Sequence, residues 1–451
     1  MCTKHDAGSQ RGLRDRQRLL AETTGSVTDP PTPQTSEPAK ILVLARMDAS
    51  TKGAGVSVRI AGIIEALAAT TTVRLVLLRT PGSPVDSAPA AELCDRLGIE
   101  WIESVVVQRR VHILQATREW WRIAFRRWHA DPQVRELVAS ADQVWVCQMH
   151  PLLDLGIPPH RSLVVDIDTA AELLWDERPQ RRAFGVKLHR RTVRRLRKRL
   201  GKESAVVLLA AEDDALIVGP EVAPACVGIL PNTAPAPSVG QQTRLAAAQT
   251  ARPPCVIMIG DMAYDPNLDG AEWLIKEVWP LVEYLRPDAR LRMIGRNACH
   301  LANRCPELRS TISIHPDVQD LSEDLLEASL SVAPMPKVTG TPIKVLQSFV
   351  WQVPVVATSV VAGAFGNEAA EFLLVADSPD DFARAIVRLL EDDDLRSRMV
   401  AAGLDRFQRH HSAARFTESI DALVEFAGDS ERTGGESQRR LRLEQRGIRP
   451  S

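Results

Sequence analysis

Residues 333–347 read Ala-Pro-Met-Pro-Lys-Val-Thr-Gly-Thr-Pro-Ile-Lys-Val-Leu-Gln. This stretch predicts a strand that ends near Pro334, a short loop, and a helix with Thr341 as its N-cap and Pro342 at its first position. The free amides of a first helical turn bind anions, and Lys344 adds a positive charge that suits a diphosphate. The alternative interpretation is an ordinary capped connection in which Lys344 is solvated.

Short apolar runs alternate with helical patterns on both sides of this stretch. The runs cover residues 40–45, 73–78, 143–147, 162–165, 205–209, 256–260, 291–295, 311–314, 330–334, 353–357 and 372–376. Nearly continuous Val, Ile and Leu is typical of parallel strands that are buried on both faces. Strand–helix alternation of this kind indicates an α/β fold with doubly wound sheets.

The alternation stops between Pro231 and Pro254, where proline and alanine are frequent, and this interruption predicts a linker. We therefore expect two Rossmann-like domains that face each other across a cleft, with ligands at the carboxyl ends of the strands. The polar ends of the chain bury too little apolar surface to offset their ordering entropy. The predicted boundaries are a disordered extension at 1–39, an N-terminal domain at 40–232, a linker at 233–253, a C-terminal domain at 254–412, a helix at 413–428 that packs back on the N-terminal domain, and a disordered tail at 429–451.

The composition excludes several classes of protein. The 451 residues include 56 basic and 57 acidic side chains, so the large basic excess of a nucleic-acid-binding protein is absent. No apolar run is long enough to span a bilayer, and the N-terminus lacks the apolar core of a signal peptide. Cys299, His300 and Cys305 lack a second ligand pair at zinc-finger spacing. We expect a cytoplasmic protein with reduced thiols and no metal site.

Residues 256–416 resemble the C-terminal domain of retaining glycosyltransferases with the GT-B fold, glycosyltransferase family 4 (group 1). The resemblance is carried, in order, by Gly260–Asn267, Trp273–Pro280, Met293–Arg296, Asp317–Leu321, Gly340–Gln347 and Pro354–Thr358. Of these, Gly340–Gln347 is similar to a Gly-Thr-Arg-x-Lys-x-x-Glu signature. The resemblance implies a hexosyltransferase that moves a sugar from a nucleotide-diphosphate donor to an acceptor hydroxyl with retention of configuration. The donor is a substrate, so no cofactor is expected.

The resemblance also assigns the two sides of the cleft. The donor nucleotide and diphosphate are expected to contact Gly53, Gly55, Arg296, Thr341, Lys344 and Gln347. Glycines in the first loop let the backbone approach a phosphate or sugar closely. The rival interpretation, a dinucleotide fold that binds NAD, is disfavoured because the loop lacks the third glycine of that motif and the second strand ends in Arg79 instead of an acid.

On the other side, His150 is expected to meet the donor sugar, and with Lys344 it is the predicted catalytic pair. Asp166 and Asp168 follow a predicted strand, where they could orient an acceptor hydroxyl or cap the next helix. Pro231 and Asn232 resemble the Pro-Asn that leads into the family's linker, which suggests a hinge.

The sequence departs from the family at several positions. The paired glutamates are replaced by Thr339 and Gln347, and the signature arginine by Pro342. A neutral Gln347 that accepts hydrogen bonds from a ribose costs about 1 kcal/mol relative to a carboxylate. Asp261 stands in the region of the usual Arg…Lys pair. These losses keep two alternatives open, a non-catalytic homologue that partners an active transferase and a nucleotide-sugar epimerase.

Two basic segments suggest contact with an anionic membrane surface. Residues 118–129 combine a Trp and Phe stripe with arginines at helical spacing, and twelve Lys and Arg residues lie between Arg178 and Lys202. The alternative is core packing of the aromatic residues with a solvated arginine face. The hypothesis places the protein at the inner face of the membrane, with a lipid-linked or envelope acceptor and no nucleic-acid partner.

Overall fold

The computed structural model describes residues 40–46, 55–79, 87–105, 130–168, 183–204, 206–222, 225–248, 254–306, 308–318 and 320–429. These residues belong to one compact unit, Ala39–Ser451. The predictions for the extension at 1–39, the basic aromatic segment at 118–129 and the tail beyond 429 lie outside the described residues.

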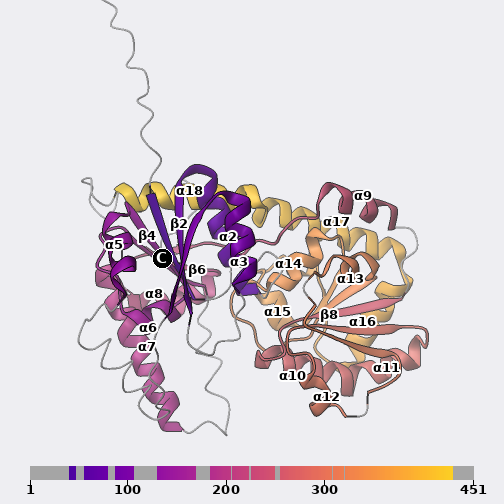
Figure 1. The fold of residues 1–451 in the computed structure, drawn as a ribbon. Helices are drawn as coiled ribbons and strands as arrows, with labels where there is room; N and C mark the ends of the chain where they lie inside the picture. Colours follow the sequence, from indigo (N-terminus) through magenta and orange to yellow (C-terminus); the bar gives the residue numbers. More distant parts are fainter. Residues whose placement is uncertain are drawn as a thin grey trace, which may run out of the picture. The chain divides into compact units, whose positions relative to one another are not determined.

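Seven parallel strands form the first sheet, in the order β3-β2-β1-β4-β5-β6-β7 (Figure 1). The strands are β1 Lys40–Ala45, β2 Thr72–Arg79, β3 Glu100–Val105, β4 Gln143–Cys147, β5 Leu163–Asp168, β6 Val206–Leu209 and β7 Cys226–Ile229. Ile41 of β1 lies opposite Val73 of β2 on one side and Gln143 of β4 on the other. The strand order therefore reverses between β1 and β4. The two edge strands, β3 and β7, are not among the predicted runs.

Helices cover both faces of the first sheet. They are α2 Gly55–Thr70, α3 Ala88–Leu97, α5 Pro132–Ser140, α6 His150–Leu155, α7 Ala183–Glu203 and α8 Glu212–Val222. Successive strand residues face opposite cores: Ile41 and Val43 pack with α2 and α3, whereas Leu42 and Leu44 pack with α5 to α8. Burial on both faces accounts for the continuous apolar runs in the sequence.

Six parallel strands form the second sheet, in the order β10-β9-β8-β11-β12-β13. The strands are β8 Cys255–Ile259, β9 Arg290–Gly295, β10 Ile312–Pro316, β11 Leu330–Ala333, β12 Val355–Ala357 and β13 Leu374–Val375. Here the order reverses between β8 and β11, which pair through Leu330 and Val256. Two doubly wound parallel sheets confirm the predicted α/β fold class.

The second sheet also has helices on both faces. One core contains α10 Asp265–Trp273, the π-helical turn η2 Leu274–Val278, α11 Trp279–Leu285, α12 His300–Arg304 and α16 Pro379–Glu391. The other contains α9 Val239–Ala248, α13 Ser322–Glu327, α14 Ile343–Val350, α15 Ser359–Gly363, the 3-10 turn η3 Ala369–Glu371 and α17 Asp393–His410. Helix α9 lies inside the predicted linker at 233–253, which is therefore not a plain extended connection.

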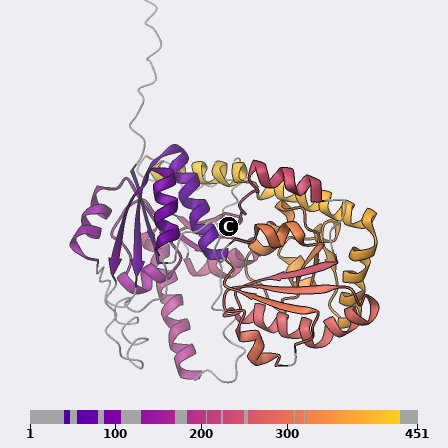
Figure 2. The ribbon, with the colours of Figure 1, turned by 45° about the vertical axis from the view of Figure 1, so that its right-hand side comes forward.

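The last helix, α18 Ala413–Asp429, packs on the first sheet and not on the second. Its apolar residues Phe416, Ile420 and Leu423 share a core with α2 and strands β1, β2 and β4. Gln143 Nε2 also donates a hydrogen bond to the Val424 carbonyl at 2.7 Å. Figures 1 and 2 show the yellow α18 beside the indigo α2. The last helix therefore completes the core on one face of the first sheet.

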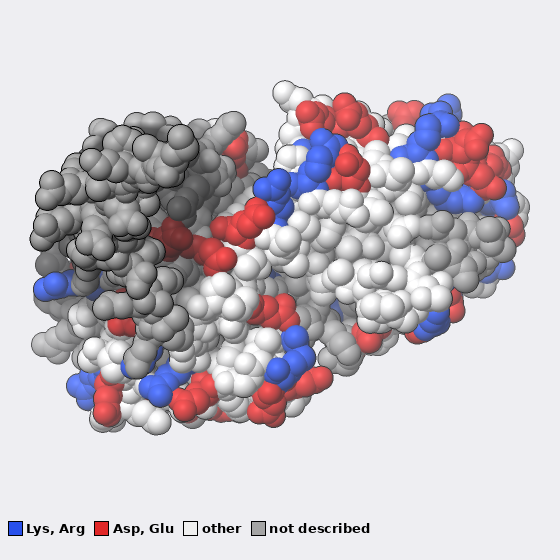
Figure 3. All heavy atoms as spheres, turned by 90° about the horizontal axis from the view of Figure 1, so that it is seen from above, with Lys and Arg blue, Asp and Glu red and all other residues white. Residues whose placement is uncertain are grey.

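Charged side chains of the described residues are mixed in sign on the face shown in Figure 3, where Lys and Arg lie beside Asp and Glu. Arg244 of α9 and Glu323 of α13, for example, pair at 2.6 Å. In the part of the chain that the structure covers, no helix combines the length and apolarity needed to cross a membrane.

Candidate active site at the carboxyl edge of the second sheet

The point where the strand order reverses positions the candidate site. At such a point, neighbouring connections leave the sheet in opposite directions and leave a crevice at the carboxyl ends of the strands. Glycines bring the backbones at this edge together. Gly295 has φ +139°, and a Cβ there would lie 2.1 Å from the Gly260 carbonyl oxygen, while a Cβ on Gly270 would lie 2.6 Å from the Pro334 carbonyl oxygen. The backbones at the ends of β8 and β9 therefore touch with no side chain between them, and α10 touches the segment after β11 in the same way.

Lys344, in the first turn of α14, is the cation of this edge. Its ammonium donates a hydrogen bond to Asn267 Oδ1, and its Nζ lies 3.1 Å from the Met335 sulfur. A Cβ placed on Gly260 would lie 3.2 Å from the same nitrogen. No carboxylate pairs with Lys344 among the described residues. Burial lowers the pKa of Lys344 to about 7, so the site holds a partly desolvated cation whose protein partners are neutral.

The start of α14 differs from the predicted one. Pro342 occupies the N-cap position, with no side-chain cap hydrogen bond, so the prediction of Thr341 as N-cap is wrong. Thr341 is buried, and its carbonyl accepts a hydrogen bond from Asn232 Nδ2 at 2.9 Å. Without a capping side chain, the first amides of α14 remain available to an anion. Gln347 lies one turn further along and is buried.

Arg296, predicted to contact the diphosphate, is engaged within the protein. Its Nη2 lies 2.9 Å from Asp261 Oδ2, and Asn297 Nδ2 donates to the other oxygen of Asp261 at 2.8 Å. Arg296 thus compensates the charge of Asp261 at the carboxyl edge of the second sheet. A role of Arg296 at the diphosphate stays a prediction, and it requires the guanidinium to contact both Asp261 and the diphosphate.

Tyr264 and Thr339 connect the loops after β8 and β11. Burial raises the pKa of Tyr264; a hydrogen bond with Thr339 opposes the shift, and the charges of Asp168 and Asp214 add to it. Thr339 stands where the resemblance expects a glutamate, so a neutral contact replaces a charge. Sequence reasoning singled out neither Tyr264 nor Asn267, although both fall in the quoted motif at 260–267.

At the carboxyl edge of the first sheet, the two predicted acids have different environments. Asp166 Oδ1 lies 2.7 Å from Arg59 Nη2, and each side chain is 1% exposed. Burial disfavours the charge of Arg59, but Asp166 and Asp168 outweigh it and raise the pKa of the guanidinium. Asp166 is therefore committed to a buried ion pair, a role that sequence reasoning missed because Arg59 is remote in the chain.

Asp168 is more accessible, with 14% of its side chain exposed, and has a left-handed backbone at φ +65°. Its Oδ1 lies 3.5 Å from Arg59 Nε and accepts no hydrogen bond from the described residues. Burial raises the pKa of Asp168; Arg59 opposes the shift, and Asp166 and Asp214 reinforce it. A poorly satisfied carboxylate in a strained backbone is typical of a functional position.

Of three further predicted residues, only Gly55 is fully described. His150 begins α6 after β4, but its side chain is outside the described part, as is Gly53 entirely. Gly55 is the first residue of α2, and a Cβ there would lie 3.4 Å from Ile343 Cδ1. The first turn of α2 thus approaches the first turn of α14.

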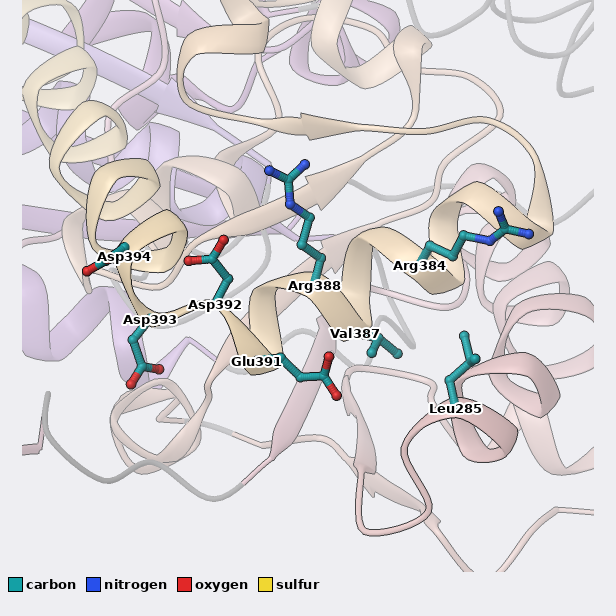
Figure 4. A pocket seen from close by; sticks show the side chains of 8 residues that line it. All are labelled: Leu285, Arg384, Val387, Arg388, Glu391, Asp392, Asp393 and Asp394. Atoms are coloured by element: carbon teal, nitrogen blue, oxygen red, sulfur yellow. The ribbon is translucent and has the colours of Figure 1, made fainter.

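A surface pocket of about 660 Å³ lies elsewhere (Figure 4). Its lining consists of Leu285 of α11, four residues of α16 and three acids at the start of α17, namely Arg384, Val387, Arg388, Glu391, Asp392, Asp393 and Asp394. Helix α16 runs back from the carboxyl edge, and Leu285 precedes the start of β9. The pocket therefore lies at the amino edge of the second sheet, away from Lys344. Within the described residues, no three His, Cys, Asp or Glu side chains are grouped to hold a metal ion.

Comparison with known proteins finds a similarity within the second half of the chain. Residues 253–392 match the family model described as "Glycosyl transferases group 1". This range contains Gly260, Asn267, Met335 and Lys344. The match makes these residues similar to a group 1 glycosyltransferase domain. No curated protein sequence matches the chain significantly.

Solved structures share the fold of both halves. Anabaena HepE, in complex with UDP and glucose, has a TM-score of 0.59 at 12% identity, over 86% of this chain and 99% of HepE. WaaG, a glycosyltransferase involved in lipopolysaccharide biosynthesis, has a TM-score of 0.57 at 15% identity, over 87% of this chain and 100% of WaaG. Sucrose-phosphate synthase of Thermosynechococcus elongatus has a TM-score of 0.59 at 13% identity, over 86% of this chain and 98% of the synthase. The likeness shows the fold, and the expected GT-B arrangement is confirmed.

Proposed function

We propose that the protein transfers a sugar from a nucleotide-diphosphate sugar to an acceptor hydroxyl, with retention of the anomeric configuration. The observation that carries this proposal is Lys344, a half-buried cation with neutral protein partners at the uncapped start of α14. A cation in this setting is stabilised by binding an anion, because its own surroundings supply no compensating charge. The group 1 match and the UDP complex of HepE support a nucleoside diphosphate as that anion.

The chemistry follows from this charge. The bond between the anomeric carbon and the β-phosphate oxygen breaks, the acceptor oxygen bonds to the same carbon from the same face, and the acceptor proton is released. Negative charge develops on the departing diphosphate, where Lys344 and the first amides of α14 stabilise it. Gln347 would accept hydrogen bonds from the ribose, and His150 would meet the sugar. The protein otherwise orients donor and acceptor.

The acceptor side is assigned to Asp168. Asp166 is occupied by Arg59, whereas an oxygen of Asp168 accepts no hydrogen bond within the described residues. Part of the Asp168 side chain is exposed, so a hydroxyl that donates to this carboxylate would hold the acceptor in place.

Two other functions remain as test outcomes, because Thr339, Pro342 and Gln347 differ from the family signature. A non-catalytic partner of an active transferase would bind a nucleoside diphosphate and turn over no donor. An epimerase would convert the donor sugar without any acceptor.

A thermal-shift screen of UDP, GDP, ADP and their sugars identifies the donor. Incubation of that donor with and without candidate glycan and lipid-linked acceptors, followed by NMR of the anomeric proton, separates the three functions and reports retention directly.

We also propose that α7 holds the protein against an anionic membrane, where a lipid-linked acceptor would be found. Arg191, Arg195, Lys198 and Lys202 are exposed and lie three or four residues apart, on one face of the helix. Anionic lipid attracts such a basic stripe.

A further inference from the structure

Asn232 is buried near the end of the first-sheet half, and its side chain bonds in two directions. Its Oδ1 accepts a hydrogen bond from Arg59 Nη1 at 2.7 Å, and its Nδ2 donates to the Thr341 carbonyl at 2.9 Å. Thr341 precedes Lys344 by three residues. One side-chain amide therefore joins a buried charge of α2 to the turn that carries the cation of the candidate site.

The chemistry of the partners fixes the orientation of this amide. A guanidinium only donates hydrogen bonds and a backbone carbonyl only accepts them, so the oxygen must face Arg59 and the nitrogen must face Thr341. Arg59 is itself held by Asp166 and by the Leu230 carbonyl, at 2.7 and 2.9 Å. Movement of Arg59 would leave a buried charge unpaired, which makes it a rigid support for Asn232.

The backbone of Asn232 is held as well. His411, at the junction of α17 and α18, lies with Nδ1 2.8 Å from the Asn232 carbonyl, so this nitrogen carries the proton. Thr233 Oγ1 donates in turn to the His411 carbonyl at 2.6 Å. Hydrogen bonds to Arg59 and His411 thus fix the side chain and the main chain of Asn232, in addition to its bond to Thr341.

We propose that Asn232 is a positioning residue that holds the turn from Thr341 to Lys344 in the geometry that binds a diphosphate. No side-chain cap fixes the start of α14, so the hydrogen bond from Asn232 supplies the restraint that a cap would otherwise give. The inference rests on the proposed function for the identity of the ligand, but the restraint itself is a property of the free protein.

The test is Asn232→Asp, which keeps an oxygen for Arg59 and replaces the donor to Thr341 with an acceptor. Calorimetric titration with UDP and with uridine should show at least tenfold weaker binding of UDP and less than a twofold change for uridine. Gln143→Glu is the matched control: it makes the same change at a buried amide whose Nε2 donates to the Val424 carbonyl and not to Thr341, and it should leave the ratio of the two affinities unchanged. ADP and GDP with their nucleosides replace these probes if wild type prefers them.

Unchanged UDP affinity, equal losses for UDP and uridine, or the same selective loss in Gln143→Glu would each overturn the inference. If wild type binds no nucleoside diphosphate, the proposed function fails, and amide hydrogen exchange then tests the restraint alone. Exchange over residues 340–346 of the free protein should be at least fivefold faster in Asn232→Asp than in wild type, and an equal rate overturns the inference. Asn232→Ala, which introduces no charge, serves both measurements if the aspartate variant does not fold.

Discussion

Arg59 and Asp166 form an ion pair that is almost completely withdrawn from solvent: Nη2 and Oδ1 are 2.7 Å apart, and each side chain is 1% exposed. The pair joins α2 to the end of β5, and Arg59 also bonds Asn232. It therefore stabilises the first half of the chain and supports the turn that holds Lys344.

Asp166→Asn should lower the free energy of unfolding by about 3 kcal/mol, because it leaves the buried charge of Arg59 with only the more distant carboxylate of Asp168. Urea denaturation measures the change. The surface pair of Arg79 and Glu103, at 2.8 Å with side chains 32% and 30% exposed, provides the control. Glu103→Gln should cost less than about 1 kcal/mol, and similar losses in the two variants would contradict this account.

Lys344→Ala should weaken UDP binding by roughly 10- to 100-fold, the loss expected for a hydrogen bond to a charged group. Uridine, which lacks the phosphates, should bind with nearly unchanged affinity. Isothermal titration of both ligands gives the comparison. Lys276→Ala is the control. It removes an exposed lysine outside α14 that pairs with Glu272, four residues earlier in the chain, and it should change neither affinity. Equal losses for UDP and uridine would exclude a phosphate role for Lys344.

The pKa of Lys344 makes a separate prediction for the free protein. Burial lowers this pKa to about 7, whereas an unfolded lysine titrates near 10.4. Between these values the unfolded state binds more protons, so stability should rise with pH, with a slope of at most about 1.4 kcal/mol per unit. Below about pH 7 both states are protonated and the contribution is constant. From pH 7 to 10 the unfolding free energy of wild type should rise relative to that of Lys344→Met, and a constant difference between the two would contradict the lowered pKa.

The sequence predicted the strands that are buried on both faces, because their apolar runs leave no alternative. It missed β3 and β7, which lie at the edges of the first sheet. It missed α9 as well, since a helix between prolines resembles a linker when only composition is considered. Local patterns therefore indicated both sheets but missed the two edge strands of the first.

At the site, the loop before α14 and its lysine could be predicted because they are contiguous in sequence. The partners could not. Asn267 lies 77 residues from Lys344, and Thr341 lies 109 residues from Asn232. Whether Asp166 faces a substrate or an arginine depends on which helix brings a basic side chain to the end of β5, and no local pattern in the sequence shows that.

Helix α7 predicts binding to anionic vesicles. Lys198→Gln combined with Lys202→Gln removes two exposed charges, each worth about 1 kcal/mol near such a surface, so binding should weaken roughly 30-fold. Co-sedimentation with vesicles that contain phosphatidylserine measures this. Arg384 and Arg409 have side chains 71% and 63% exposed and belong to the second half of the chain. Their double glutamine variant is the control, and an equal effect of both double variants would argue against a specific role of α7.

Gly295→Ala tests the backbone contact that brings the loops of the candidate site together. The new Cβ would lie 2.1 Å from the Gly260 carbonyl oxygen, and φ +139° is strained for any residue with a side chain. Since neither backbone can retreat without separating β8 from β9, the variant should lose about 3 kcal/mol or more in urea denaturation. Gly363→Ala is the contrasting change, because no atom lies within 4 Å of its added Cβ at the end of α15. It should change stability by less than about 1 kcal/mol. A well-folded Gly295→Ala that also binds UDP as wild type does would show that close approach of these loops is not what builds the site.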